Sequence, residues 1–369
     1  MKKKINHILP ALVLTASLGL TTVSCNGFLD EMPDNRTELN TDQKIAKLLV
    51  SAYADVSPNE LFELYSDNSD DSGPTYGYYK LSEQECYHWQ DTKEEYQDTP
   101  NSLWGGYYSA IAAANMALNA IEEKGNPASL DPQRGEALVC RAYCHFMLAN
   151  IFCNAYDTHA SQSLGVPYME EVETTVSPRY ERGTLEEVYR KVERDLLEGI
   201  DLISDDSYSV PKYHFTRKAA YAFAARFYLY YMKPDFSNCD RVIDFATRVL
   251  GTNPADLLRN WEALGNLSVN GNVQADAYIA SSNEANLLIS STVSNWGAIG
   301  SDYLIGPRYF HNQTLATSET CLSSGLWGSS DYFYLKPFST NGFVASILRK
   351  SGLYEGSYLY YMPVLFSMD

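Results

Sequence analysis

A series of helical hydrophobic patterns between residues 104 and 250 is the feature that most constrains the fold of this chain. Over 104–124 and again over 133–152, apolar residues recur every three or four positions, as they do where one side of a helix is buried. Gly125 and Pro127 end the first segment, and Asp131-Pro132 is typical of a helix start with Asp131 as the N-cap. Two long helices joined by so short a connection are expected to pack antiparallel.

Three more helical segments follow a loop. Thr184 and Glu187 are spaced as a capping box ahead of an apolar periodicity that continues to Ile203. A further helix is predicted over 216–232, where several alanines would let a neighbouring helix approach closely, and another over 238–250. Paired helices of this length predict a mainly α fold, a tetratricopeptide-like helical repeat scaffold with long loops and a few short strands.

The rest of the chain is less regular. A first helix is predicted over 41–55, and two loop-rich regions are predicted at about 66–103 and 260–345, where Ser, Asn, Gly and aromatic residues replace the periodic pattern. Short strands are expected in the second of these regions. We expect residues 41–369 to form one domain.

The first 24 residues are interpreted as a signal peptide. A basic start at Lys2–Lys4 precedes a short apolar stretch from Ile8 to Leu20, and small residues then lead to Cys25. A cysteine in this place is typical of a bacterial lipoprotein, in which it becomes the lipidated N-terminus. The prediction is a signal peptide over 1–24 and a lipidated tether over 25–40. The alternative is an ordinary secretory signal with an incidental cysteine.

Two cysteines and a histidine in the second helical pattern admit two interpretations. Cys140, Cys144 and His145 could be metal ligands, but no second cluster completes such a site. Within an apolar helical pattern a thiol behaves as a small hydrophobic side chain, so we predict that these residues pack in the core and bind no metal.

Composition excludes some partners and leaves others open. The formal net charge is −18, from 46 acidic and 28 basic residues, so the surface repels the phosphate backbone of nucleic acid. The 29 tyrosines fit either an aromatic binding surface or packing between helices. Glycine-rich phosphate loops, nucleophile elbows and His-Glu-x-x-His motifs are absent from the sequence, which predicts a protein without cofactor or catalytic machinery.

Several segments, taken in order, resemble the SusD/RagB family of nutrient-binding outer-membrane lipoproteins. The segments that carry the resemblance are Ser24-Cys25 with Phe28-Leu29-Asp30 and Pro33, Trp104 with Tyr107-Tyr108, Ile111 and Asn115, Gly135-Glu136-Ala137 with Arg141-Ala142 and Phe146, Gly165-Val166-Pro167, Thr184 to Ile203, Thr216-Arg217 with Ala219-Ala220 and Arg226, and Ser282-Asn283-Glu284 before a short strand at Leu287-Leu288-Ile289. The resemblance implies a SusD-like scaffold and runs from residue 24 to the last residue. There it breaks off before an expected acidic-start helix with an Arg-Ala-Glu motif, so the C-terminal part of the family fold is expected to be missing.

The resemblance also implies a function. Members bind an oligosaccharide at the cell surface, anchored to the outer membrane by lipid, and deliver it to a SusC-like TonB-dependent transporter. A peptide ligand, as in RagB-like members, is the first alternative. A surface glycoside hydrolase and a scaffold without a ligand are further alternatives, since 46 carboxylates make a catalytic pair possible by number alone.

Loop aromatics are the candidate ligand-binding residues. Flat aromatic faces stack on the apolar faces of sugar rings, and Tyr76, Tyr78 and Trp89 before the repeats and Trp296 after them have the required type and place. The alternative for each is packing of a loop onto the scaffold. Trp104 opens a helical pattern and is expected in the core.

Overall fold

Helices form almost all of the regular structure. The computed structural model describes residues 39–67, 69–71, 73–74, 80–175, 178–267, 273–294 and 308–310. The chain divides into two units, Met1–Leu39 and Asn40–Asp369, and the helices and strands of the described residues belong to the second. In chain order the elements are α2 (Asp42–Leu48), the 3₁₀ turn η1 (Leu49–Ala52), α3 (Asn59–Leu64), β1 (Asp70–Asp71), α4 (Leu81–Tyr87), α5 (Pro100–Glu123), η2 (Ala128–Leu130), α6 (Asp131–Phe152), α7 (Leu185–Leu202), η3 (Asp205–Ser207), η4 (Pro211–Tyr213), α8 (Arg217–Tyr230), α9 (Cys239–Leu250), η5 (Pro254–Leu257), α10 (Trp261–Gly265), α11 (Val273–Ile279) and β2 (Tyr309–Phe310).

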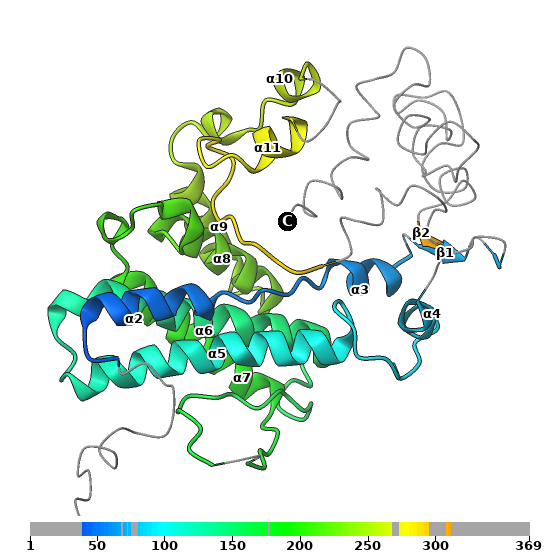
Figure 1. Ribbon diagram of the computed structural model, residues 1–369, viewed down its shortest axis with the longest axis horizontal. Helices are drawn as coiled ribbons and strands as arrows, with labels where there is room; N and C mark the ends of the chain where they lie inside the picture. The colour runs from blue at the N-terminus through cyan, green and yellow to red at the C-terminus, as the bar shows by residue number, and fades with distance from the viewer. Residues whose placement is uncertain are drawn as a thin grey trace, which may run out of the picture. The chain divides into compact units, whose positions relative to one another are not determined.

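The central helix of the scaffold is α6. It packs against both α5 and α7, and most of its side chains are buried. In Figure 1, α5 and α6 run alongside each other. Gly125, with φ +81°, allows the chain to reverse between α5 and α6. Cys140 and Cys144 are both 1% exposed, so their predicted place in the core is confirmed. The mainly α fold predicted from the periodicity is confirmed as well.

Two glycines bring α6 and α7 close together. A Cβ atom built on Gly135 would lie 2.7 Å from the carbonyl oxygen of Gly199, and one built on Gly199 would lie 2.8 Å from the carbonyl oxygen of Gly135. Real Cβ atoms essentially never approach backbone so closely, so the two helices depend on glycine at both positions. The α6–α7 contact therefore leaves no room for side chains at its tightest point.

Aromatic rings fill the space between α6 and α8. Phe146 lies 5.6 Å from Phe223 and 5.9 Å from Phe227, measured between ring centroids, and Phe227 lies 5.7 Å from Tyr189 on α7. Offset and edge-on pairs at these distances add to the burial of apolar area. Many of the tyrosines noted in the composition thus pack between helices, and α9 covers the far side of α8.

The loop between α6 and α7 is fastened across the scaffold by polar contacts. The Tyr108 hydroxyl donates to the carbonyl of Pro167 at 2.8 Å, and the Asn115 amide donates to the carbonyl of Met169 at 3.1 Å. The backbone N–H of Met169 donates in turn to Nε2 of His145 at 3.0 Å. Since an N–H donor requires a lone pair, this imidazole is neutral.

Helix boundaries follow the sequence closely, with three corrections. Thr184 and Glu187 form the predicted capping box at the start of α7. Asp131, however, is the first residue of α6 rather than its N-cap, because the turn η2 runs directly into the helix. Residues 41–55 divide into α2 and η1. Residues 287–289 do not form a strand, because their backbone contact among the described residues is with the turn η4, where Ile289 N–H donates to the Lys212 carbonyl.

The described residues contain no helix long and apolar enough to cross a membrane.

Candidate functional site

Trp89 is the one predicted ligand-binding residue that the structure describes. Tyr76, Tyr78, Trp296 and the predicted lipidation site Cys25 lie outside the described residues. Trp89 follows the end of α4 and is 72% exposed. Its ring stacks on that of Tyr65 at the end of α3, with centroids 4.4 Å apart and an angle of 16° between the planes.

The backbone at Trp89 has a conformation that usually belongs to glycine. Its φ is +56°, its N–H donates to the Cys86 carbonyl at 2.9 Å, and the N–H of Gln90 reaches the Glu85 carbonyl at 2.8 Å. This pair of bonds is the Schellman motif, in which a left-handed residue ends a helix. A tryptophan in that position costs on the order of 1 kcal/mol or more, and strain of this kind is concentrated at functional sites.

Beside Trp89 lies a hollow that we name the platform hollow. Its volume is about 540 Å³, and its walls come from α3, the loop after α4, the start of α5 and the end of α6. Its lining residues are Leu61, Tyr65, Gln90, Asp91, Thr92, Pro100, Asn101, Trp104, Ile151 and Phe152. Aromatic faces thus lie beside amide, hydroxyl and carboxylate groups, a combination suited to a sugar ring and its hydroxyls.

Trp104 departs from its expected place in the core. It is half-buried, stacks edge-on against Phe152 with centroids 5.0 Å apart, and lines the platform hollow. The helix α5 begins four residues earlier, at Pro100, so Trp104 lies in the first turns, where α6 ends and no longer covers it. The sequence alone therefore did not identify Trp104 as a candidate ligand-binding residue.

Two carboxylates, one buried and one half-buried, hold the loop that carries this site. The Glu85 carboxylate accepts from the backbone N–H of Lys93 at 2.9 Å, and Glu94 accepts from the N–H of Ser82 at 3.2 Å. Burial, and then the charge of Asp98, raise the pKa of Glu60 to about 8. A carboxyl with that pKa is protonated in neutral solution, so Glu60 adds no second negative charge beside Asp98.

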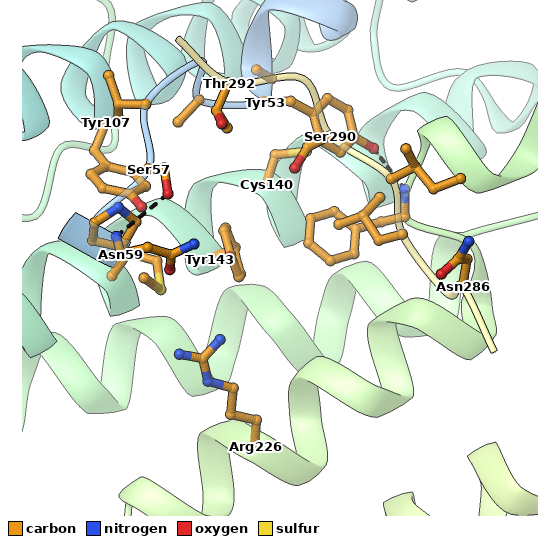
Figure 2. A pocket seen from close by; sticks show the side chains of 18 of the residues that line it. Tyr53, Ser57, Asn59, Tyr107, Cys140, Tyr143, Arg226, Asn286, Ser290 and Thr292 are labelled. Carbon is orange, nitrogen blue, oxygen red and sulfur yellow. Dashed lines mark hydrogen bonds between the residues drawn. The ribbon is translucent and has the colours of Figure 1, made fainter. Parts of the chain in front are cut away.

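A second hollow, which we name the tyrosine pocket, lies on the other side of α3. Figure 2 shows its interior, and its volume is about 350 Å³. The described residues that line it are Ala52, Tyr53, Ala54, Val56, Ser57, Pro58, Asn59, Phe62, Tyr107, Cys140, Tyr143, Met147, Phe215, Arg226, Tyr278, Ile279, Asn286, Leu288, Ile289, Ser290 and Thr292. They come mainly from η1, α3, α5, α6, α8, α11 and the segment after α11, so no local motif encodes this pocket.

The wall formed by residues 278–293 is fixed by hydrogen bonds to the scaffold. Val293 N–H donates to the Asp55 carbonyl at 2.6 Å and Ile289 N–H to the Lys212 carbonyl at 2.8 Å. Arg259 donates to the side chain of Asn286 at 2.7 Å. These contacts hold the extended segment across the mouth of the tyrosine pocket.

Neither hollow resembles a hydrolytic site. Among the described lining residues, the platform hollow has a single carboxylate, Asp91, and the tyrosine pocket has none. Glycoside hydrolysis uses a pair of carboxyl groups on either side of the scissile bond. Across the described residues, no three His, Cys, Asp or Glu side chains are grouped so as to hold a metal ion.

Comparisons with known proteins agree with this geometry. The SusD-like family model described as "Starch-binding associating with outer membrane" matches residues 27–229. A solved SusD superfamily protein from Bacteroides thetaiotaomicron is 19% identical, with a TM-score of 0.50 over 61% of this chain and 50% of its own. A SusD-like carbohydrate binding protein from Bacteroides vulgatus is 17% identical, with a TM-score of 0.49 over 73% and 56%. No curated protein matches the chain.

At 19% identity, the likeness to the Bacteroides thetaiotaomicron structure supports the fold of this chain and leaves its ligand open. The chain spans about half the length of these structures.

Proposed function

This chain belongs to the SusD-like family, and from that premise we propose that it is a carbohydrate-binding lipoprotein of the outer membrane that takes part in nutrient uptake. The family description supports both the ligand class and the association with the outer membrane. In this proposal the protein binds an oligosaccharide at the cell surface and delivers it to a SusC-like TonB-dependent transporter.

The exposed Trp89, stacked on the half-buried Tyr65, is the observation that carries the proposal. Stacked rings at the rim of a hollow present a flat apolar surface, and a sugar ring offers a matching apolar face. Gln90 and Asn101, which line the same hollow, supply amide donors and acceptors for sugar hydroxyls. The strained backbone at Trp89 fits a residue retained for contact with a ligand.

The membrane anchor rests on the sequence before the first helix. The basic start, the short apolar segment and the small residues ahead of Cys25 support lipidation of that cysteine. Two or more acyl chains on one residue hold a protein stably at a bilayer, since each buried CH₂ contributes about 0.8 kcal/mol. We expect Cys25→Ser to abolish labelling by palmitate and to release the protein from the membrane fraction.

Calorimetric titration of the purified chain with neutral oligosaccharides, beginning with maltoheptaose, tests the binding function. We expect saturable binding without products, and a loss of affinity of about tenfold or more for Trp89→Ala, which corresponds to about 1.4 kcal/mol or more. Phe236→Ala is the matched control, because Phe236 is also exposed (67%) and also has a φ of +56°.

Four outcomes would contradict the proposal. Absence of binding by any saccharide would remove the ligand class, and binding of oligopeptides instead would favour the RagB-like alternative. Release of shorter sugars, detected by chromatography, would indicate a hydrolase. Equal losses for Trp89→Ala and Phe236→Ala would move the site away from the platform hollow.

A further inference from the structure

The tyrosine pocket differs in charge from the rest of the molecule. The chain has a formal net charge of −18, yet no carboxylate is present among the described residues that line this pocket. Arg226 is the only charged side chain among those lining residues. A local positive charge in an acidic protein indicates a ligand with a negative group.

Arg226 has no carboxylate partner among the described residues. Its guanidinium lies 5.7 Å from the centroid of Phe146 and 5.8 Å from that of Tyr230. In Figure 2 it extends from α8 toward Tyr143. The Arg226 side chain is exposed and interacts with the Tyr143 hydroxyl. The rest of its planar fork matches the two oxygens of a carboxylate.

Two tyrosines complete the polar end of the pocket. Tyr107 is 2% exposed, and its hydroxyl has no hydrogen-bond partner among the described residues. Burial raises the pKa of Tyr107 and of Tyr143, so both hydroxyls stay protonated and can donate to an anion. Asn59, Ser290 and Thr292 offer groups of the kind that bind sugar hydroxyls.

We propose that the tyrosine pocket binds the carboxylate of an acidic sugar residue, with Arg226 as the ion-pair partner and the hydroxyls of Tyr107 and Tyr143 as hydrogen-bond donors. The proposal rests on the proposed function only in taking the ligand to be a saccharide. A single guanidinium balances the single charge of a uronic acid, and a volume of about 350 Å³ lies within the usual range for small-molecule sites.

The acidic surface opposes an anionic ligand, but only at long range. At physiological ionic strength, exposed charges more than about 8 Å apart are largely screened. A contact ion pair, by contrast, acts at a separation well below this screening length. The guanidinium therefore decides the preference inside the pocket.

Paired ligands that differ only in charge test this proposal. The full chain is titrated by calorimetry with trimers of galacturonate, glucuronate and mannuronate, and with the methyl ester of each. We expect at least one free acid to bind about tenfold or more tightly than its ester. Arg226→Gln should abolish that difference, whereas Arg190→Gln, at an exposed position on α7, should preserve it.

Arg226→Gln must unfold at the same urea concentration as the wild type, and Tyr143→Phe, which removes one donor, is a second variant with a smaller expected loss. Equal affinities for acid and ester, or a preference that survives Arg226→Gln, would overturn the proposal. Failure of every uronic acid to bind while a neutral oligosaccharide binds would overturn it and leave the proposed function standing. Failure of acidic and neutral sugars alike would remove both.

Discussion

Two arginines, Arg141 and Arg226, have opposite surroundings. Arg141 on α6 faces α5 and α7, and it donates to Asp195 at 2.6 Å, to Asn115 at 3.0 Å and to the Glu170 carbonyl at 3.3 Å. Arg226 on α8 faces the tyrosine pocket and has ring faces for neighbours. A buried charge survives in a core only when it is paired, so Arg141 belongs to the structure. Arg226 is exposed and has no carboxylate partner among the described residues.

The two sides of the scaffold also differ in how their titratable groups are satisfied. Around Arg141, His145 uses both ring nitrogens, one donating to the Arg141 carbonyl at 2.9 Å and the other accepting from Met169. On the side of α3, one oxygen of the buried Glu60 carboxyl has no hydrogen-bond partner among the described residues. The polar side chains around Arg141 thus form a closed hydrogen-bond network among α5, α6 and α7. Near the hollows, by contrast, a buried carboxyl oxygen has no hydrogen-bond partner among the described residues.

Breaking the closed network should have the largest effect. Asp195→Ala leaves Arg141 and the Tyr168 hydroxyl without their common acceptor, and we expect a loss of about 3–5 kcal/mol in the free energy of unfolding. Urea denaturation measures the change. Glu198→Ala is the control on the same helix, because its pair with Arg134 is exposed and should contribute about 1 kcal/mol or less. Similar losses for the two variants would contradict the comparison.

The close approach of α6 and α7 gives the next largest effect. Gly135→Ala places a methyl group against the backbone of α7 and should destabilise the protein by about 1–3 kcal/mol. Gly105→Ala is the matched control in α5, since nothing lies within 4 Å of a Cβ atom there. That control should be neutral or stabilise the helix by up to about 1 kcal/mol. Thermal unfolding followed by circular dichroism distinguishes the two variants.

The two regions should respond to pH in opposite directions. Burial lowers the pKa of His145 to about 3, so between pH 6.5 and 3 the unfolded chain binds more protons there, and stability falls as pH falls. Burial and Asp98 raise the pKa of Glu60 to about 8, so between pH 4.5 and 8 the folded chain binds more protons, and stability falls as pH rises.

Glu60→Gln tests this contrast. The variant lacks the gain that the wild type obtains on acidification, so the stability difference between wild type and variant should grow as pH is lowered from 8 to 5. Urea denaturation at several pH values measures it. A difference that stays constant over this range would show that Glu60 has an ordinary pKa.

Substitution of Arg226, which has no carboxylate partner among the described residues, should have the smallest effect on stability. Arg226→Gln should change the free energy of unfolding by about 0.5 kcal/mol or less, because no described carboxylate loses its partner. A loss of several kcal/mol in urea denaturation would place Arg226 with Arg141 as a structural residue.

Part of the candidate site could be predicted from residue type and part could not. Trp89 stands out as an aromatic residue in a polar loop, but its stack on Tyr65 joins residues from α3 and the end of α4. Trp104 was expected in the core, because the helical pattern does not show where the neighbouring helix ends. Arg226 appeared only as one residue of the family resemblance, since the walls of its pocket come from segments between residues 52 and 292.

The sequence by itself determined the helices of the scaffold. Apolar spacing and local capping groups, such as Thr184 with Glu187 and Thr216 at the start of α8, act within a few residues of one another and so can be read from the chain alone. Only the tertiary structure decided that Arg141 has hydrogen-bond partners from three segments and that Arg226 has no carboxylate partner among the described residues. The partners of Arg141 come from residues 115, 170 and 195, and burial and pairing at that range depend on packing rather than on neighbours in the chain.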